Sequence, residues 1–143
     1  MRCDPVEEAR QWIGTPYLHQ ASVCGVGCDC LGLLRGVWRA LYGAEPEAVP
    51  AYTPDWDEPQ GQERLWAAAL RHMTPAGPDW GIGQVLLFQM RKGAVAKHLG
   101  ILSKGAPRLT FIHAYSGHGV VESPLSQPWR RRVVARFVFP LKG

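Results

Sequence analysis

The spacing of apolar residues changes midway along the chain, and this change constrains the fold more than any other feature. Before residue 84, apolar residues recur every three or four positions, as on one face of a helix. Later segments rich in β-branched and aromatic residues predict strands at residues 84–90, 97–103, 108–115, 119–122 and 133–139. Helices followed by consecutive strands are typical of an α+β fold with an antiparallel sheet.

Helical spacing and end signals predict three helices before the strands, at residues 4–13, 30–43 and 62–73. Asp4 and Pro5 supply an N-cap and a first helical residue for the first of them. Residues 18–29 lack a regular pattern and predict a loop. Gly32 and Gly36 weaken an isolated helix, so we expect them to permit close packing of another element.

The chain has 143 residues, enough for one hydrophobic core, so we expect a single domain over residues 1–143. The first residues lack the apolar core of a secretory signal, and no stretch reaches the ~20 apolar residues of a membrane span. We therefore expect synthesis in the cytoplasm without a signal peptide. The net charge of +4 only weakly suggests an anionic partner, and Arg130, Arg131 and Arg132 are interpreted as a solvated strand end.

Cys30 and two histidines provide the clearest chemical signal. Three of the four cysteines crowd between residues 24 and 30, which is unlike a disulfide framework and favours reduced thiols. A thiol at the start of a helix gains from the positive helix end, so we expect a lowered pKa for Cys30. His98 and His113 lie on consecutive predicted strands, where they could meet as a base and the group that orients it.

Four motifs in order resemble the NlpC-type cell-wall peptidases, a family of papain-like cysteine hydrolases. The motifs are Gly14-Thr15-Pro16-Tyr17-Leu18, Asp29-Cys30-Leu31-Gly32-Leu33, His98-Leu99-Gly100-Ile101 and Ile112-His113-Ala114. The chain departs from the family pattern in two places: Leu31 stands where serine is common, and the Gly-Gly after the aromatic motif is absent. Both departures concern the choice of substrate rather than the reacting groups.

The resemblance implies a role for each matching residue. It implies Cys30 as nucleophile, His98 as general base and His113 as the residue that orients the base. Tyr17 would border the site, and Asp29 would bind the free amino end of a substrate while also capping the central helix. The implied reaction is hydrolysis of peptidoglycan stem peptides, at the bond joining D-glutamate to a diamino acid, without a cofactor or a metal. The chain also resembles forms associated with phage tails and gene-transfer particles, which makes tail proteins possible partners; no nucleic-acid partner is expected.

Three alternatives remain open. Cys24, Cys28 and Cys30 could bind zinc with a nearby histidine, although their spacing matches no usual zinc signature. The domain could have lost catalysis and serve as a tail-assembly or wall-binding module. An acyltransferase on the same scaffold would share the thioester step and differ in the nucleophile that resolves it.

Overall fold

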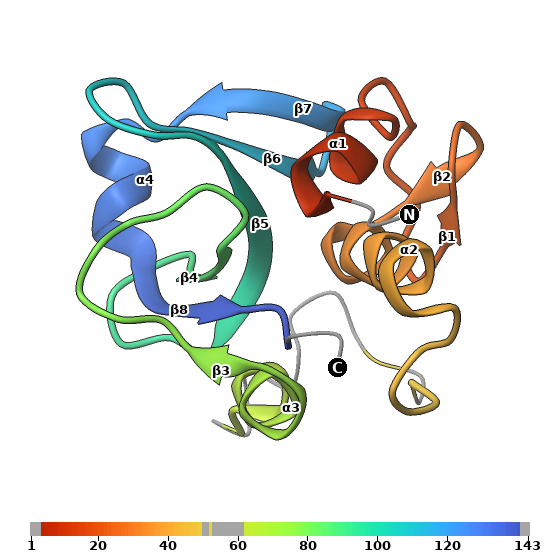
Figure 1. Ribbon diagram of the computed structural model, residues 1–143, viewed down its shortest axis with the longest axis horizontal. Coiled ribbons are helices and arrows are strands. Elements are labelled where there is room, and N and C mark those ends of the chain that lie inside the picture. Colours follow the sequence, from red (N-terminus) through yellow and green to blue (C-terminus); the bar gives the residue numbers. More distant parts are fainter. Residues whose placement is uncertain (1–3, 50–51, 53–61, 141–143) are drawn as a thin grey trace.

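The protein forms a curled antiparallel sheet with helices on both of its faces. The computed structural model describes residues 4–49, 52 and 62–140. The helices are α1 (Pro5–Arg10), α2 (Cys30–Tyr42), α3 (Arg64–His72) and α4 (Gln127–Arg132). The strands are β1 (Ser22–Val23), β2 (Gly27–Cys28), β3 (Thr74–Pro75), β4 (Val85–Gln89), β5 (Ala96–Lys104), β6 (Thr110–Tyr115), β7 (Gly119–Pro124) and β8 (Val133–Val138). In Figure 1, α1, α2 and the β1–β2 hairpin lie together on one side of the sheet, and α4 lies on the other.

The main sheet confirms the predicted α+β class. Its six strands follow the order β3-β8-β4-β5-β6-β7, and all neighbouring pairs are antiparallel. The predicted first, central and third helices correspond to α1, α2 and α3, and the five predicted strands to β4–β8. Among the described residues, no helix has both the length and the apolar character needed to cross a membrane.

Strand β4 is apolar and buried at four consecutive positions, Val85 to Phe88, because both faces of the sheet are covered there. On β4, Val85 and Leu87 face a core cluster that includes the α2 residues Leu33 and Val37. Leu86 and Phe88 face a second cluster, to which the α4 residue Trp129 contributes; its further members are Leu102, Phe111 and Leu125. A sheet buried on both faces loses the alternation of polar and apolar residues that marks a half-exposed strand.

Three features differ from the sequence prediction. The arginines at 130–132 form the last turn of α4 rather than the end of a strand. This helix has six residues and no buried member, so it carries no apolar stripe for sequence periodicity to detect. The predicted loop at 18–29 contains the β1–β2 hairpin, and β3 adds a two-residue edge to the sheet. Strands of two residues are too short to show a period.

Gly36 allows the turn that follows α1 to pack closely on α2, as the sequence predicts for the glycines of this helix. A Cβ atom at this position would lie 2.0 Å from the ring of Trp12, which is buried. We expect Gly36→Ala to lower the free energy of unfolding by about 3 kcal/mol, because overpacking outweighs the gain in helix propensity. Urea denaturation measures this change. Gly77→Ala, where nothing lies within 4 Å of an added Cβ, is the control and should change it little; equal losses in both variants would contradict the packing argument.

Candidate active site

Cys30 occupies the first position of α2, against the backbone of β5. The residue is 7% exposed, and its thiol donates to the carbonyl oxygen of Lys97 at 3.7 Å. Lys97 directly precedes His98 in the chain and sits at an irregularity in the β4–β5 pairing. The predicted nucleophile therefore lies beside the segment of β5 that carries the predicted base.

The pKa of Cys30 is opposite to the sequence expectation. Burial, reinforced by the nearby Asp29 carboxylate, raises the pKa of this thiol to about 12. Hydrogen bonds from backbone amides, led by that of Leu99, lower the pKa but do not compensate. The prediction that the start of the helix lowers the pKa of Cys30 is therefore wrong, because the effect of desolvation is larger than that of the positive helix end. Cys30 is a neutral thiol at physiological pH.

The two predicted histidines meet in a chain of hydrogen bonds. Nε2 of His98 on β5 lies 2.7 Å from Nδ1 of His113 on β6. Nε2 of His113 lies 3.0 Å from Oγ of Ser123 on β7. The order across three neighbouring strands is therefore Ser123–His113–His98. Sequence analysis missed Ser123, because a serine at the end of a short strand carries no distinguishing pattern.

Aromatic rings surround the histidine pair. The ring of Trp129 from α4 lies 5.6 Å from that of His98 and 5.1 Å from that of His113. Phe88, Phe111 and Tyr115 also contact the pair. Burial is the main reason that the pKa of His98 lies well below its ordinary value and that of His113 is lowered to about 4. Both rings are neutral at pH 7.

Among the described residues, no hydrogen bond joins the thiol of Cys30 to His98. The thiol belongs to the core cluster on the α2 side of the sheet, whereas the imidazoles contact rings of the second cluster. Nδ1 of His98 has no hydrogen-bond partner among the residues that the structure describes, yet it is not one of the fully buried polar atoms that lack a partner, so it retains slight contact with solvent. The structure thus brings His98 and His113 together and leaves one nitrogen of His98 available.

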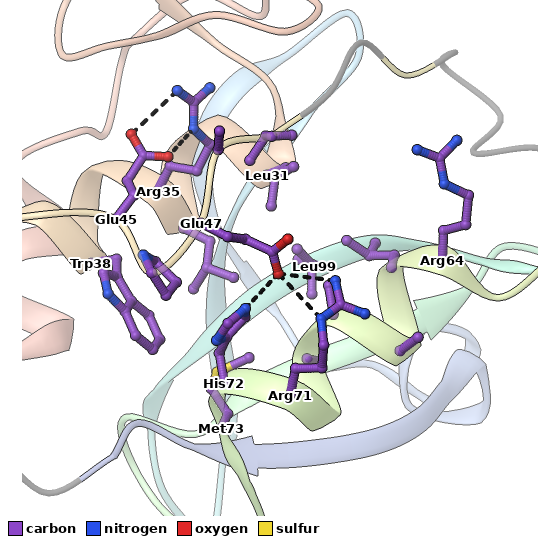
Figure 2. Close-up of a pocket in the computed structure, with 18 residues that line it drawn as sticks. Leu31, Arg35, Trp38, Glu45, Glu47, Arg64, Arg71, His72, Met73 and Leu99 are labelled. Atoms are coloured by element: carbon purple, nitrogen blue, oxygen red, sulfur yellow. Dashed lines mark hydrogen bonds and ion pairs between the residues drawn. The ribbon is translucent and has the colours of Figure 1, made fainter.

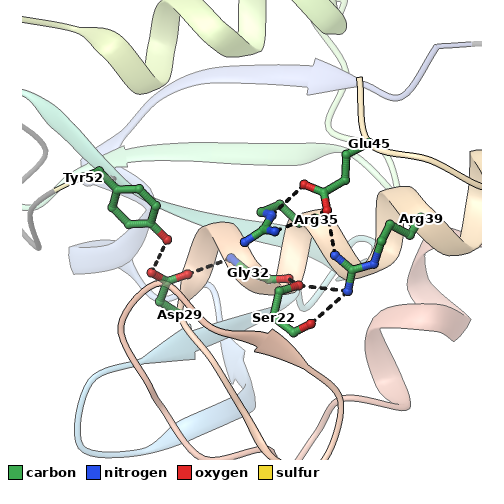
Figure 3. A network of polar contacts seen from close by, with 7 residues as sticks. All are labelled: Ser22, Asp29, Gly32, Arg35, Arg39, Glu45 and Tyr52. Atoms are coloured by element: carbon green, nitrogen blue, oxygen red, sulfur yellow. Dashed lines mark hydrogen bonds and ion pairs between the residues drawn. The ribbon is translucent and has the colours of Figure 1, made fainter. Parts of the chain in front are cut away.

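Asp29 anchors the start of α2 through both of its oxygens (Figure 3). Oδ1 accepts from the backbone amide of Gly32 at 2.7 Å, which makes Asp29 the N-cap of the helix. Oδ2 accepts from the hydroxyl of Tyr52, which Figure 3 also shows. It accepts in addition from the amide of Gln20 at 2.7 Å. The residue is 2% exposed. Its place in the structure is that of a buried cap, and Tyr52 is a neighbour that sequence analysis did not find.

Tyr17 lies close to the candidate nucleophile. Its backbone forms a bridge with Cys28, two residues before Cys30. The ring is partly buried, and its pKa is raised to about 12 by burial and by the proximity of Cys30 and Asp29. Tyr17 therefore lies near Cys30, and its role at the border of the site stays a prediction.

A cavity of about 270 Å³ opens between α2 and α3 (Figure 2). Leu34 and Leu99 line it, and both also line a small neighbouring pocket that contains Cys30. Charged groups at its edge pair with one another: Arg35 donates to Glu45, and Glu47 accepts from Arg71 and contacts His72. The cavity is therefore mainly apolar and adjoins the candidate site.

The cysteine cluster does not form a metal site in the described part of the chain. Cys24, Cys28 and Cys30 are free thiols. Across residues 4–49, 52 and 62–140, no three His, Cys, Asp or Glu residues are grouped so that they could hold a metal ion.

Burial of the histidine pair should make the fold sensitive to acid. The unfolded chain, with histidine pKa values near 6.5, binds more protons than the folded protein down to about pH 4, where His113 titrates. The free energy of unfolding should therefore fall as the pH drops from 6.5 to 4. Urea denaturation at several pH values measures this slope, and His113→Asn should reduce it. A wild-type stability that stays constant over this window would contradict the burial of neutral rings.

Comparison with known proteins identifies the fold. No family model matches the sequence, and no curated protein sequence matches it. Solved structures do: an NLP/P60 family protein, similar to lipoprotein, from Staphylococcus aureus subsp. aureus Mu50 has 18% identity and a TM-score of 0.62 over 97% of this chain. An NlpC/P60 family protein from Bacillus cereus ATCC 10987 has 15% identity and a TM-score of 0.64 over 95% of this chain. Ly7917 has 15% identity and a TM-score of 0.61 over 96% of it.

These matches show that the chain has the α+β papain-like fold of NlpC/P60 proteins. The chain spans 41%, 39% and 62% of the lengths of the three matched chains, in the order given. The shared part is therefore the domain described here, and the longer proteins contain further segments.

Proposed function

We propose that this domain is a cysteine peptidase that hydrolyses peptidoglycan stem peptides. The observation that carries the proposal is the hydrogen-bonded pair His98–His113 beside a cysteine at the start of a helix. A nucleophile, a base and a group that orients the base are the parts that acyl transfer through a thioester requires. The fold and the four sequence motifs agree with this assignment.

The proposed reaction begins from neutral groups. The thiol of Cys30 gives up its hydrogen bond to the Lys97 carbonyl and turns to Nδ1 of His98, which takes its proton. The resulting thiolate attacks the amide carbonyl carbon. The C–N bond breaks as protonated His98 gives its proton to the leaving amine, and a thioester remains. His98 then activates water, which releases the acid and the thiol. In this proposal, the backbone amide of Cys30 at the start of α2 donates to the oxyanion.

The proposal extends to the substrate and its setting. The family resemblance favours the bond between D-glutamate and a diamino acid, with Tyr17 and Asp29 at the substrate side of the site. It also favours a domain made in the cytoplasm and carried by a phage-like particle with tail proteins as partners. Antibodies against the domain test this setting, since they should detect it in purified particles from the producing cells.

A digest of purified peptidoglycan tests the activity. Wild type and Cys30→Ala are incubated with it, and released fragments are identified by mass spectrometry. Fragments from wild type alone support the proposal and identify the bond. A parallel digest contains an added amine acceptor. Fragments that carry this amine, where hydrolysis would have added water, would instead indicate an acyltransferase.

A binding module is the second candidate, and one observation favours it. The thiol of Cys30 is protonated, buried and not hydrogen-bonded to His98. A module that has lost catalysis would release no fragments in the digest, and would sediment with insoluble peptidoglycan whether or not Cys30 is alkylated.

A further inference from the structure

Ser123 ends the hydrogen-bonded chain that begins at His98. Its backbone on β7 pairs with Phe111 on β6, and its hydroxyl lies 3.0 Å from Nε2 of His113. Among the described residues, it is the only side chain hydrogen-bonded to that nitrogen. The rings of Trp129 and Tyr115 also contact His113, whose side chain is fully buried.

Two arrangements of protons satisfy this chain. In the first, His113 donates from Nε2 to Ser123 and accepts at Nδ1 from Nε2 of His98. In the second, Ser123 donates to His113, whose Nδ1–H donates to His98. The first leaves a lone pair on Nδ1 of His98, and the second leaves an N–H there that has no acceptor among the described residues. His98 is only 6% exposed, and a poorly solvated donor without a protein acceptor costs more than an under-satisfied acceptor, which favours the first arrangement.

We propose that Ser123 is a positioning residue that holds His113 in the Nε2–H tautomer and thereby keeps Nδ1 of His98 unprotonated. Its contribution to catalysis rests on the proposed peptidase function, whereas its control of the tautomer does not. Ser123 acts through two imidazoles and touches no reacting atom. Its hydroxyl can accept from His113 while its own proton points to solvent, since the residue is only half-buried.

Threonine and valine at position 123 provide a matched pair of variants. Both are β-branched and suit a strand, and they differ only in a hydroxyl against a methyl group. Ser123→Thr should keep the wild-type behaviour. Ser123→Val should lower kcat about tenfold with little change in KM, the effect expected for one neutral hydrogen bond. Ser126→Ala removes an exposed serine whose side chain makes no cap hydrogen bond, and should match wild type.

Two-bond ¹H–¹⁵N correlation spectra of the histidine rings provide a readout that does not depend on activity. We expect the Nε2–H tautomer at both histidines in wild type and in Ser123→Thr. In Ser123→Val, the Nδ1–H form of His113 should appear. Ser123→Ala provides a second test of the lost hydroxyl if the valine variant does not fold.

The spectra decide the proposal in every case. An Nδ1–H tautomer of His113 in wild type, or identical spectra for the threonine variant and a folded hydroxyl-free variant, would overturn it. If wild type releases no peptidoglycan fragments but removal of the hydroxyl changes the tautomer, the peptidase function fails and the role of Ser123 stands.

Discussion

Cys30→Ala should reduce kcat by about 10⁴-fold or more, because removal of a nucleophile that acts together with its base eliminates the covalent route. The free energy of unfolding should fall by no more than about 1 kcal/mol, since only one buried atom is lost and its hydrogen bond to Lys97 is a weak sulfur contact. Fragment release from peptidoglycan and urea denaturation measure the two effects.

Cys28→Ala is the matched control for this variant. Cys28 is also a buried cysteine, two residues earlier on β2, and it lies outside the histidine chain. The control should retain activity. Wild-type activity in Cys30→Ala, or equal losses in both variants, would remove Cys30 from the reaction.

Asp29→Ala should cause the largest loss of stability among these substitutions, about 3–5 kcal/mol. The change removes the N-cap of α2 and deletes a buried carboxylate that accepts from the amide of Gln20 and the hydroxyl of Tyr52. The pKa of Tyr52, raised by burial and by this contact, should fall toward its ordinary value in a variant that remains folded. Urea denaturation followed by tryptophan fluorescence measures the loss.

Asp4→Ala provides the comparison, because Asp4 is an exposed N-cap with a single bond to the amide of Val6. We expect it to cost about 1 kcal/mol. A smaller loss at Asp29 than at Asp4 would mean that the buried carboxylate is not needed by the fold, and would favour a role only in substrate binding.

The sequence predicted those helices and strands whose apolar residues recur with a regular period, or whose ends carry a helix cap. The start of α2 at Cys30 follows from an aspartate cap, and its end follows from Gly43, which adopts a positive φ. The meeting of His98 and His113 follows from consecutive antiparallel strands. Local patterns of this kind survive folding because tertiary contacts reinforce them.

Other features depend on three-dimensional neighbours that no local pattern encodes. The pKa of Cys30 rises because strands distant in sequence remove water from it, so a rule about helix ends gave the wrong direction. Trp129 reaches the histidines from a six-residue helix that has no apolar stripe, and Ser123 reaches His113 from another strand. These contacts arise from the register and curvature of the sheet.

The burial of Cys30 also determines how the protein withstands oxidation. Peroxides react with the thiolate, and a protonated thiol that is 7% exposed offers them little of that form. Cys24 lies on the surface only a few residues away, where an oxidant meets it first. Chemical damage should therefore collect on the β1–β2 hairpin while the sulfur at the start of α2 stays reduced.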